Sequence, residues 1–161
     1  MSVILPGSYD PVTLGHLDII RRAAEKYGEV YAVVFINPDK EYAFSIEDRV
    51  AMLMLATEDI EGCMVSYSVG RVVDYMREHG IEKIVKGYRS EADLAYERPQ
   101  AEYNMLHGGY PTEYMESLDE YKNISSTLAR ARIDARESLD GILPERVARY
   151  IEDMKHRESD G

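Results

Sequence analysis

The chain has 161 residues, of which 45% are hydrophobic and 30% are charged, a composition typical of one globular domain, here residues 1–161. Its formal net charge of -11 argues against a nucleic-acid partner, because phosphate backbones are bound by basic surfaces. With no apolar run of about 20 residues, no signal-peptide pattern at residues 1–5 and a single cysteine, we expect a cytoplasmic protein with no membrane partner.

Short apolar runs alternate with amphipathic stretches in the first half of the chain. Residues 3–5 are typical of a strand, and the apolar pattern that follows predicts a helix ending at Gly28. The β-branched run 30–36 predicts a strand covered on both faces, and Ser45 with acids in the next turn opens a helix through residue 57. Residues 63–67, 70–79 and 83–87 then predict a strand, a helix and a strand.

The second half continues the same alternation. A helix is expected from Glu91, interrupted at Pro99 because proline lacks an N–H group and its ring clashes with the preceding turn. Residues 112–117 predict a fifth strand, and helices are expected near 126–138 and 144–157. This pattern predicts an α/β fold, a Rossmann-like doubly wound five-stranded parallel sheet with helices on both faces.

Polar and basic segments follow four of the predicted strands. They are residues 7–16, 37–40, 86–89 and 121–127, and the carboxyl ends of parallel strands are where such sheets bind ligands. Four cations, Lys40, Lys86, Arg89 and Arg130, therefore gather at one edge of an acidic protein. With helix N-termini to supply N–H groups, this edge is typical of a polyphosphate site.

Each segment alone has an ordinary structural explanation. A Gly-Ser-Tyr-Asp turn is usually only a turn, a histidine near a helix start is often a cap, and serines before a helix are first N-caps. Their joint placement favours function. The sequence has neither a P-loop nor the G-x-G-x-x-G dinucleotide fingerprint, and no nucleophile elbow, H-E-x-x-H or C-x-x-C motif.

Three motifs resemble those of known nucleotidyltransferases. "GSYDPVTLGH" (7–16) resembles the G-[ST]-[FY]-D-P-x-[TH]-x-G-H (HxGH-type) signature of the nucleotidyltransferase superfamily, and "ISSTLAR" (124–130) resembles its second signature. "KGYRSEADLAYE" (86–97) is similar to the [RK]-G-[LY]-R-x-x-x-D-x-x-Y-E motif of bacterial phosphopantetheine adenylyltransferases. Three further features agree with that family: the length of the chain, the position of Lys40 two residues after Pro38, and Thr13 in place of histidine.

The resemblance implies transfer of AMP from ATP to 4'-phosphopantetheine, giving dephospho-coenzyme A and pyrophosphate in coenzyme A biosynthesis. The acceptor phosphate is already an anionic nucleophile, so the chemistry needs in-line positioning and charge stabilisation rather than an activated side chain. The resemblance also implies Mg²⁺ held mainly by phosphate oxygens, a homohexamer, and coenzyme A as a candidate feedback ligand. No protein residue is expected as a metal ligand.

The same resemblance assigns residue roles. His16, Lys40, Arg89 and Ser126 are the expected catalytic residues, with His16 on the α-phosphate. Ser8 and Tyr9 lie at the junction of the two substrates, and the acceptor side includes Ser8, Lys40, Val72, Lys86 and Asn104. The expected ATP-binding residues are Ser8, Tyr9, His16, Gly87, Tyr88, Arg89, Glu97, Tyr121, Lys122, Asn123, Ile124, Ser125, Ser126 and Thr127.

Five positions depart from the family pattern: Arg71, Lys86, Pro99, Tyr103 and Ala131. These departures are explained by sequence drift within the family with compensating changes elsewhere. They are also explained by a different acceptor substrate or by weakened catalysis. Two other classes of acceptor therefore stay open, nicotinate mononucleotide and glycerol 3-phosphate, the latter with CTP. A non-catalytic nucleotide- or coenzyme A-binding protein is the remaining alternative.

Overall fold

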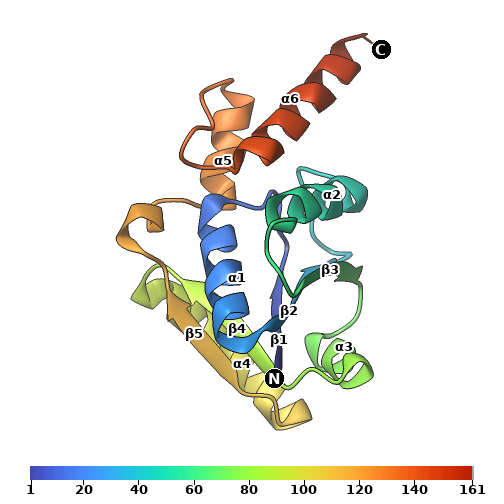
Figure 1. Cartoon of the computed structure of the whole chain (residues 1–161), viewed down its shortest axis with the longest axis vertical. Coiled ribbons are helices and arrows are strands. Elements are labelled where there is room, and N and C mark those ends of the chain that lie inside the picture. Colours follow the sequence, from blue (N-terminus) through green and yellow to red (C-terminus); the bar gives the residue numbers. More distant parts are fainter. Residues whose placement is uncertain (161) are drawn as a thin grey trace.

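Five parallel strands form the centre of the protein (Figure 1). The computed structural model describes residues 1–160, with side chains through residue 158. The strand order is β3-β2-β1-β4-β5, and every neighbouring pair is parallel, which confirms the predicted sheet. The strands are β1 (Ser2–Gly7), β2 (Glu29–Phe35), β3 (Cys63–Ser68), β4 (Lys83–Tyr88) and β5 (Thr112–Glu116).

Helices cover both faces of the sheet, as predicted (Figure 1). Alternate residues of β1 point to opposite faces, so Val3 and Leu5 join one apolar cluster and Ile4 joins another. The first cluster holds α1 (Leu14–Tyr27) and α2 (Ile46–Thr57), whereas α3 (Val72–His79) contributes to the second and α4 (Glu91–Gly108) lies beside α3 and β4.

Serine and threonine hydroxyls set the start of four helices. Each accepts a hydrogen bond from the N–H group three residues on, which satisfies a first-turn donor that has no intrahelical partner. These N-caps agree with the helix starts that the sequence predicts. The pairs are Thr13 with His16 at 3.3 Å, Ser45 with Asp48 at 3.1 Å, Ser90 with Asp93 at 3.3 Å and Ser125 with Leu128 at 3.0 Å.

The C-terminal helices differ in length from the prediction. After the short turn η1 (Asp119–Tyr121), α5 (Ser126–Asp134) ends four residues before residue 138, and α6 (Glu145–Asp160) packs against α2 before projecting from the body (Figure 1). Arg136 has a φ of 57°, in the left-handed region that ends a right-handed helix. The chain turns there because Ile142 and Leu143 are then buried in the first cluster.

The predicted interruption at Pro99 is wrong, because α4 runs through it from Glu91 to Gly108. Proline removes one helical hydrogen bond, to the carbonyl of Ala95. Both residues are exposed, so water can solvate that carbonyl and the helix tolerates the loss. Only Asn104 of α4 is buried, which leaves most of the helix surface in solvent.

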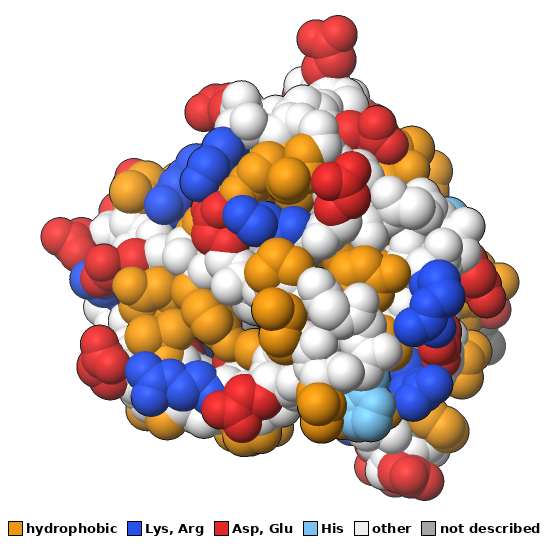
Figure 2. Space-filling model, turned by 90° about the horizontal axis from the view of Figure 1, so that it is seen from below, with side chains coloured by type: hydrophobic (Ala, Val, Ile, Leu, Met, Phe, Trp, Pro, Cys, Tyr) orange, Lys and Arg blue, Asp and Glu red, His pale blue; other side chains and the backbone are white. Residues whose placement is uncertain are grey.

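The end of the molecule opposite the strand carboxyl ends carries interleaved charges. Figure 2 views this end, where the N-terminus lies, and acidic and basic side chains alternate around scattered apolar patches. Lys26 and Lys83 form ion pairs with Glu113, at 2.9 Å and 3.4 Å, and the hydroxyl of Tyr27 also donates to this carboxylate. Among residues 1–160, no helix is long and apolar enough to cross a membrane.

We expect Pro99→Ala to stabilise the protein, because alanine restores the N–H bond to the carbonyl of Ala95 and removes the ring clash. The gain, reduced by the larger entropy of the unfolded variant, should be about 2 kcal/mol in the free energy of unfolding, measured in urea. The exposed neighbour Arg98→Ala is the control and should change it by less than about 0.5 kcal/mol. A Pro99→Ala variant no more stable than the parent would contradict this account.

Candidate active site

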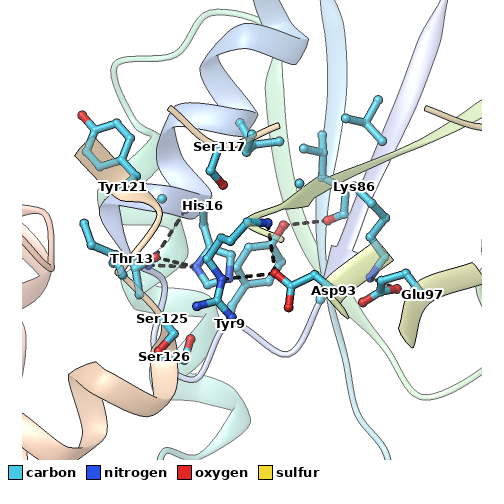
Figure 3. A pocket seen from close by; sticks show the side chains of 18 of the residues that line it. Tyr9, Thr13, His16, Lys86, Asp93, Glu97, Ser117, Tyr121, Ser125 and Ser126 are labelled. Carbon is cyan, nitrogen blue, oxygen red and sulfur yellow. Dashed lines mark hydrogen bonds and ion pairs between the residues drawn. The ribbon is translucent and has the colours of Figure 1, made fainter. Parts of the chain in front are cut away.

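A cavity of about 280 Å³ opens at the carboxyl ends of β1 and β4 (Figure 3). These two strands are neighbours in the sheet. The chain first adds β2 and β3 on one side of β1, and then crosses over to add β4 and β5 on the other side. Ligands of open parallel sheets bind at such a point of reversal. Of the residues predicted from the sequence, ten line this cavity: Tyr9, His16, Lys86, Gly87, Arg89, Glu97, Tyr121, Ile124, Ser125 and Ser126.

The imidazole of His16 is held by the residue that caps its own helix. The backbone N–H of Thr13 donates to Nδ1 of His16 at 3.0 Å, and the Thr13 hydroxyl oxygen lies 3.1 Å from the same nitrogen (Figure 3). A nitrogen that accepts a backbone N–H carries no proton, so the neutral ring carries its proton on Nε2. His16 therefore offers the cavity a hydrogen-bond donor.

The electrostatic surroundings keep His16 neutral. Burial, followed by the positive charges of Lys86 and Arg89, lowers the pKa of His16 from 6.5 to about 4. The neighbouring Tyr9 has a left-handed φ of 46° and a buried ring whose hydroxyl donates to the carbonyl of Leu5 at 2.8 Å. Burial also raises the pKa of Tyr9, so its hydroxyl stays protonated. Neither ring carries a charge at neutral pH.

The two cations of the cavity are each paired with a carboxylate from α4. Lys86 Nζ lies 3.4 Å from Glu97, and Arg89 Nε lies 3.4 Å from Asp93, which also accepts the Arg89 N–H at 3.0 Å. The two acids are four residues apart, so they share one face of the helix, towards the cavity (Figure 3). These side chains are partly exposed, and such pairs contribute only about 0–1 kcal/mol each. Phosphate oxygens can therefore replace the carboxylates at little cost.

The N-terminus of α5 closes one side of the cavity. Ser125 is the N-cap, and the hydroxyl of Ser126 donates to the carbonyl of Pro11 at 2.8 Å. Because that proton is engaged, the available donors here are the first-turn backbone N–H groups, at the positive end of the helix dipole. Arg130 donates to the carbonyl of Asp10 at 2.8 Å, so it ties α5 to the turn after β1 and does not line the cavity.

Gly87 has a packing role beside its predicted ligand role. A Cβ atom at this position would lie 2.8 Å from Cγ1 of Ile19, in α1. Glycine therefore lets α1 approach the end of β4 closely enough for His16 and Lys86 to line the same cavity.

Four of the predicted nucleotide residues lie outside the cavity lining. The ring of Tyr88 packs edge-on against Tyr114, and Asn123 is exposed between η1 and α5. Lys122 forms ion pairs with Glu116 at 2.9 Å and Asp119 at 3.0 Å. The hydroxyl of Thr127 accepts a hydrogen bond from Arg130 at 3.2 Å.

Four residues predicted to bind the acceptor also lie outside the cavity lining. The carbonyl of Ser8 accepts from Arg49 at 3.1 Å, and Lys40 is exposed in the loop after β2. Val72 begins α3, and Asn104 is buried in α4, where its side-chain oxygen accepts from Gln100 at 3.4 Å. The roles of all the predicted site residues, inside and outside the cavity lining, remain predictions.

The sequence assigned no role to four polar side chains of the cavity lining: Thr13, Asp93, Tyr96 and Ser117. Asp93 occupies the fixed aspartate position of the motif over residues 86–97 and could have been found from it. Ser117 directly follows β5 and donates its N–H to the carbonyl of Tyr88 at 2.8 Å. Its position at a strand end was a second available signal.

Two positions that depart from the family pattern contact each other. Nη1 of Arg71 donates to the hydroxyl of Tyr103 at 2.7 Å, and Arg71 also forms an ion pair with Asp74 at 3.0 Å. Neither lines the cavity. This contact joins the start of α3 to α4.

We expect His16 to titrate at about pH 4 and to carry its proton on Nε2 at pH 7, because Thr13 occupies Nδ1 and two cations lie nearby. Long-range ¹H–¹⁵N spectra measure both properties. Lys86→Met removes one of these charges and should raise the pKa, whereas the exposed Lys155→Met in α6 should not change it. A pKa at or above the ordinary value, or a proton on Nδ1, would contradict the assignment.

The chain matches the cytidylyltransferase-like family over residues 4–132, which includes the whole cavity. It is 38% identical over 152 residues to a phosphopantetheine adenylyltransferase of Corynebacterium glutamicum (strain R), covering 94% of this chain and 95% of that protein. The enzyme of the same name from Symbiobacterium thermophilum is 40% identical over 94% of each chain, and that of Clostridium novyi is 38% identical over 92% of each. With the fold and the cavity in agreement, this chain belongs to the phosphopantetheine adenylyltransferase family.

Proposed function

We propose that this protein transfers AMP from ATP to 4'-phosphopantetheine, giving dephospho-coenzyme A and pyrophosphate. The observation that carries the proposal is the neutral His16, with its proton on Nε2, in a cavity that also holds Lys86 and Arg89. This is a site for binding phosphate and stabilising developing negative charge, with no nucleophilic serine or cysteine required.

The reaction is one in-line displacement. An oxygen of the acceptor phosphate forms a bond to the α-phosphorus, and the bond from that phosphorus to the bridging oxygen of the β-phosphate breaks. Pyrophosphate leaves with the electron pair, so no proton has to be removed from the nucleophile. The protein therefore acts by positioning and by electrostatics.

Several of the predicted site residues have a role in this scheme. His16 donates from Nε2 to an α-phosphate oxygen, where charge grows in the transition state. Lys86 and Arg89 exchange Glu97 and Asp93 for phosphate oxygens, and the α5 N-terminus binds further phosphate oxygens. Tyr121 and Ile124 flank the nucleoside, and Lys40, from the loop after β2, binds the acceptor phosphate.

Mg²⁺ would arrive with ATP in this proposal. Within residues 1–160 no group of three or more histidine, cysteine, aspartate or glutamate side chains is arranged to hold a metal ion. The two cavity carboxylates are paired with cations. We therefore place the ion on phosphate oxygens, where it would offset the charge of the leaving pyrophosphate.

We also propose a homohexamer, a cytoplasmic location, where ATP is abundant, and coenzyme A as a feedback ligand. Exposed apolar side chains support self-association. On α4, Met105 and Leu106 are 54% and 81% exposed, and Tyr67 on the edge strand β3 is 59% exposed. Burying such side chains against further copies would remove apolar surface from water.

We expect pyrophosphate release with ATP and 4'-phosphopantetheine, and much less with CTP or with nicotinate mononucleotide or glycerol 3-phosphate as acceptor. A coupled assay of pyrophosphate measures all combinations. Turnover on another acceptor without turnover on 4'-phosphopantetheine would reject the proposed substrate. Tight coenzyme A binding with no turnover on any acceptor would indicate a binding protein instead.

We expect His16→Ala to lower kcat by about 100- to 1000-fold, because the lost hydrogen bond strengthens in the transition state. The dissociation constant of ATP, measured by calorimetry, should change far less. His79→Ala is the matched control, since His79 is exposed and stacks on Tyr75 outside the cavity. Weaker ATP binding at an unchanged kcat would rule out the role given to His16.

A further inference from the structure

The loop that carries Lys40 is fixed to the turn after β1. Residues 37–44 follow the end of β2, and both carboxylate oxygens of Asp10 bind the far end of this loop. They accept from the N–H groups of Ala43 at 2.8 Å and Phe44 at 2.9 Å. Asp10 is buried and is adjacent to Tyr9, which lines the cavity. This end of the loop is therefore anchored to the site.

A buried arginine lies beneath the same loop. Arg49 is 2% exposed, Nη1 donates to the carbonyl of Ser8 at 3.1 Å, and Nε donates to the carbonyl of Phe44 at 3.2 Å. Among the side chains described through residue 158, no carboxylate forms an ion pair with this guanidinium. A buried cation without a counter-charge is costly unless other groups stabilise it.

Tyr42 supplies such a group. The guanidinium carbon of Arg49 lies 3.8 Å from the centroid of the Tyr42 ring, within the range of a cation–π contact. The hydroxyl of Tyr42 accepts from the N–H of Asn37 at 2.9 Å, which closes the near end of the loop. Lys40 Nζ lies 5.4 Å from the same ring. One aromatic side chain thus contacts the buried cation, the start of the loop and Lys40.

We propose that Tyr42 is a positioning residue that, held by Arg49, presents Lys40 to the substrate phosphates. This inference rests on the proposed function, in which Lys40 binds the acceptor phosphate. Lys40 is exposed and outside the cavity lining, so its long side chain would otherwise sample many conformations. The ring limits that freedom before the substrate binds, and this lowers the entropic cost of reaching the transition state.

A double-mutant cycle tests the proposal. Tyr42→Ala should lower kcat about tenfold and change the ATP KM by less than about twofold. In a Lys40→Ala background the same substitution should change kcat by less than about twofold, because the residue it positions is already absent. Tyr42→Phe keeps the ring and should retain most of the activity. Arg149→Ala, at an exposed side chain of α6, is the control and should match the parent.

A second measurement does not depend on turnover. Backbone amide order parameters of residues 37–41 should fall from about 0.85 to below about 0.6 in Tyr42→Ala, while thermal unfolding shows that the variant remains folded. Equal effects of Tyr42→Ala in both backgrounds, or an unchanged order parameter at Lys40, would overturn the proposal. Lack of turnover by the parent on 4'-phosphopantetheine would reject the proposed function. If the parent is active but the effects of the Tyr42 and Lys40 substitutions on kcat are additive, only the role of Tyr42 is rejected.

Discussion

The paired hydrogen bonds between Thr13 and His16 are the constraint on which the site depends. The Thr13 hydroxyl accepts the His16 N–H and so begins α1, while the Thr13 N–H donates to Nδ1 and so fixes the imidazole. Thr13 is only 2% exposed, which protects both bonds from competition by water. The same pair of residues therefore sets the start of α1, the orientation of the His16 ring and the tautomer of that ring. A hydrogen-bond donor on Nε2 of His16 is thus held in the cavity by the protein's own backbone and side chain.

The site also shows how an acidic protein accommodates anions. Lys86 and Arg89 approach the same cavity, and their mutual repulsion is offset by Glu97 and Asp93 from the facing helix. These carboxylates orient the cations while the pairs stay partly exposed and weak. In the proposed function, a phosphate group would replace a weakly bound carboxylate as the partner of each cation. The net charge of -11 is thus compatible with polyphosphate binding, since local charge decides the affinity.

Much of the fold and of the first motif could be predicted because the signals are local. Hydrophobic periodicity located all five strands, and serine N-caps marked the helix starts after residues 45 and 125. Pro99 misled the prediction because the cost of a proline depends on the exposure of the carbonyl it frees, which depends on packing. The end of α5 was missed for a similar reason, since Leu143 is buried only after the chain reverses.

The sequence by itself determined the class of fold, the edge of the sheet at which the cavity opens, and the motifs that indicate nucleotidyl transfer. These follow from short-range patterns, namely strand and helix periods, caps and the spacing of a few polar residues. The tertiary structure alone decided which residues face the cavity and which are engaged elsewhere. In the folded protein, Ser126 donates a hydrogen bond to the carbonyl of Pro11, Lys122 forms ion pairs with two acids, and Asp93 forms an ion pair with Arg89. The physical reason is that a polar side chain binds the nearest complementary group, and for Ser126 that group lies 115 residues away along the chain.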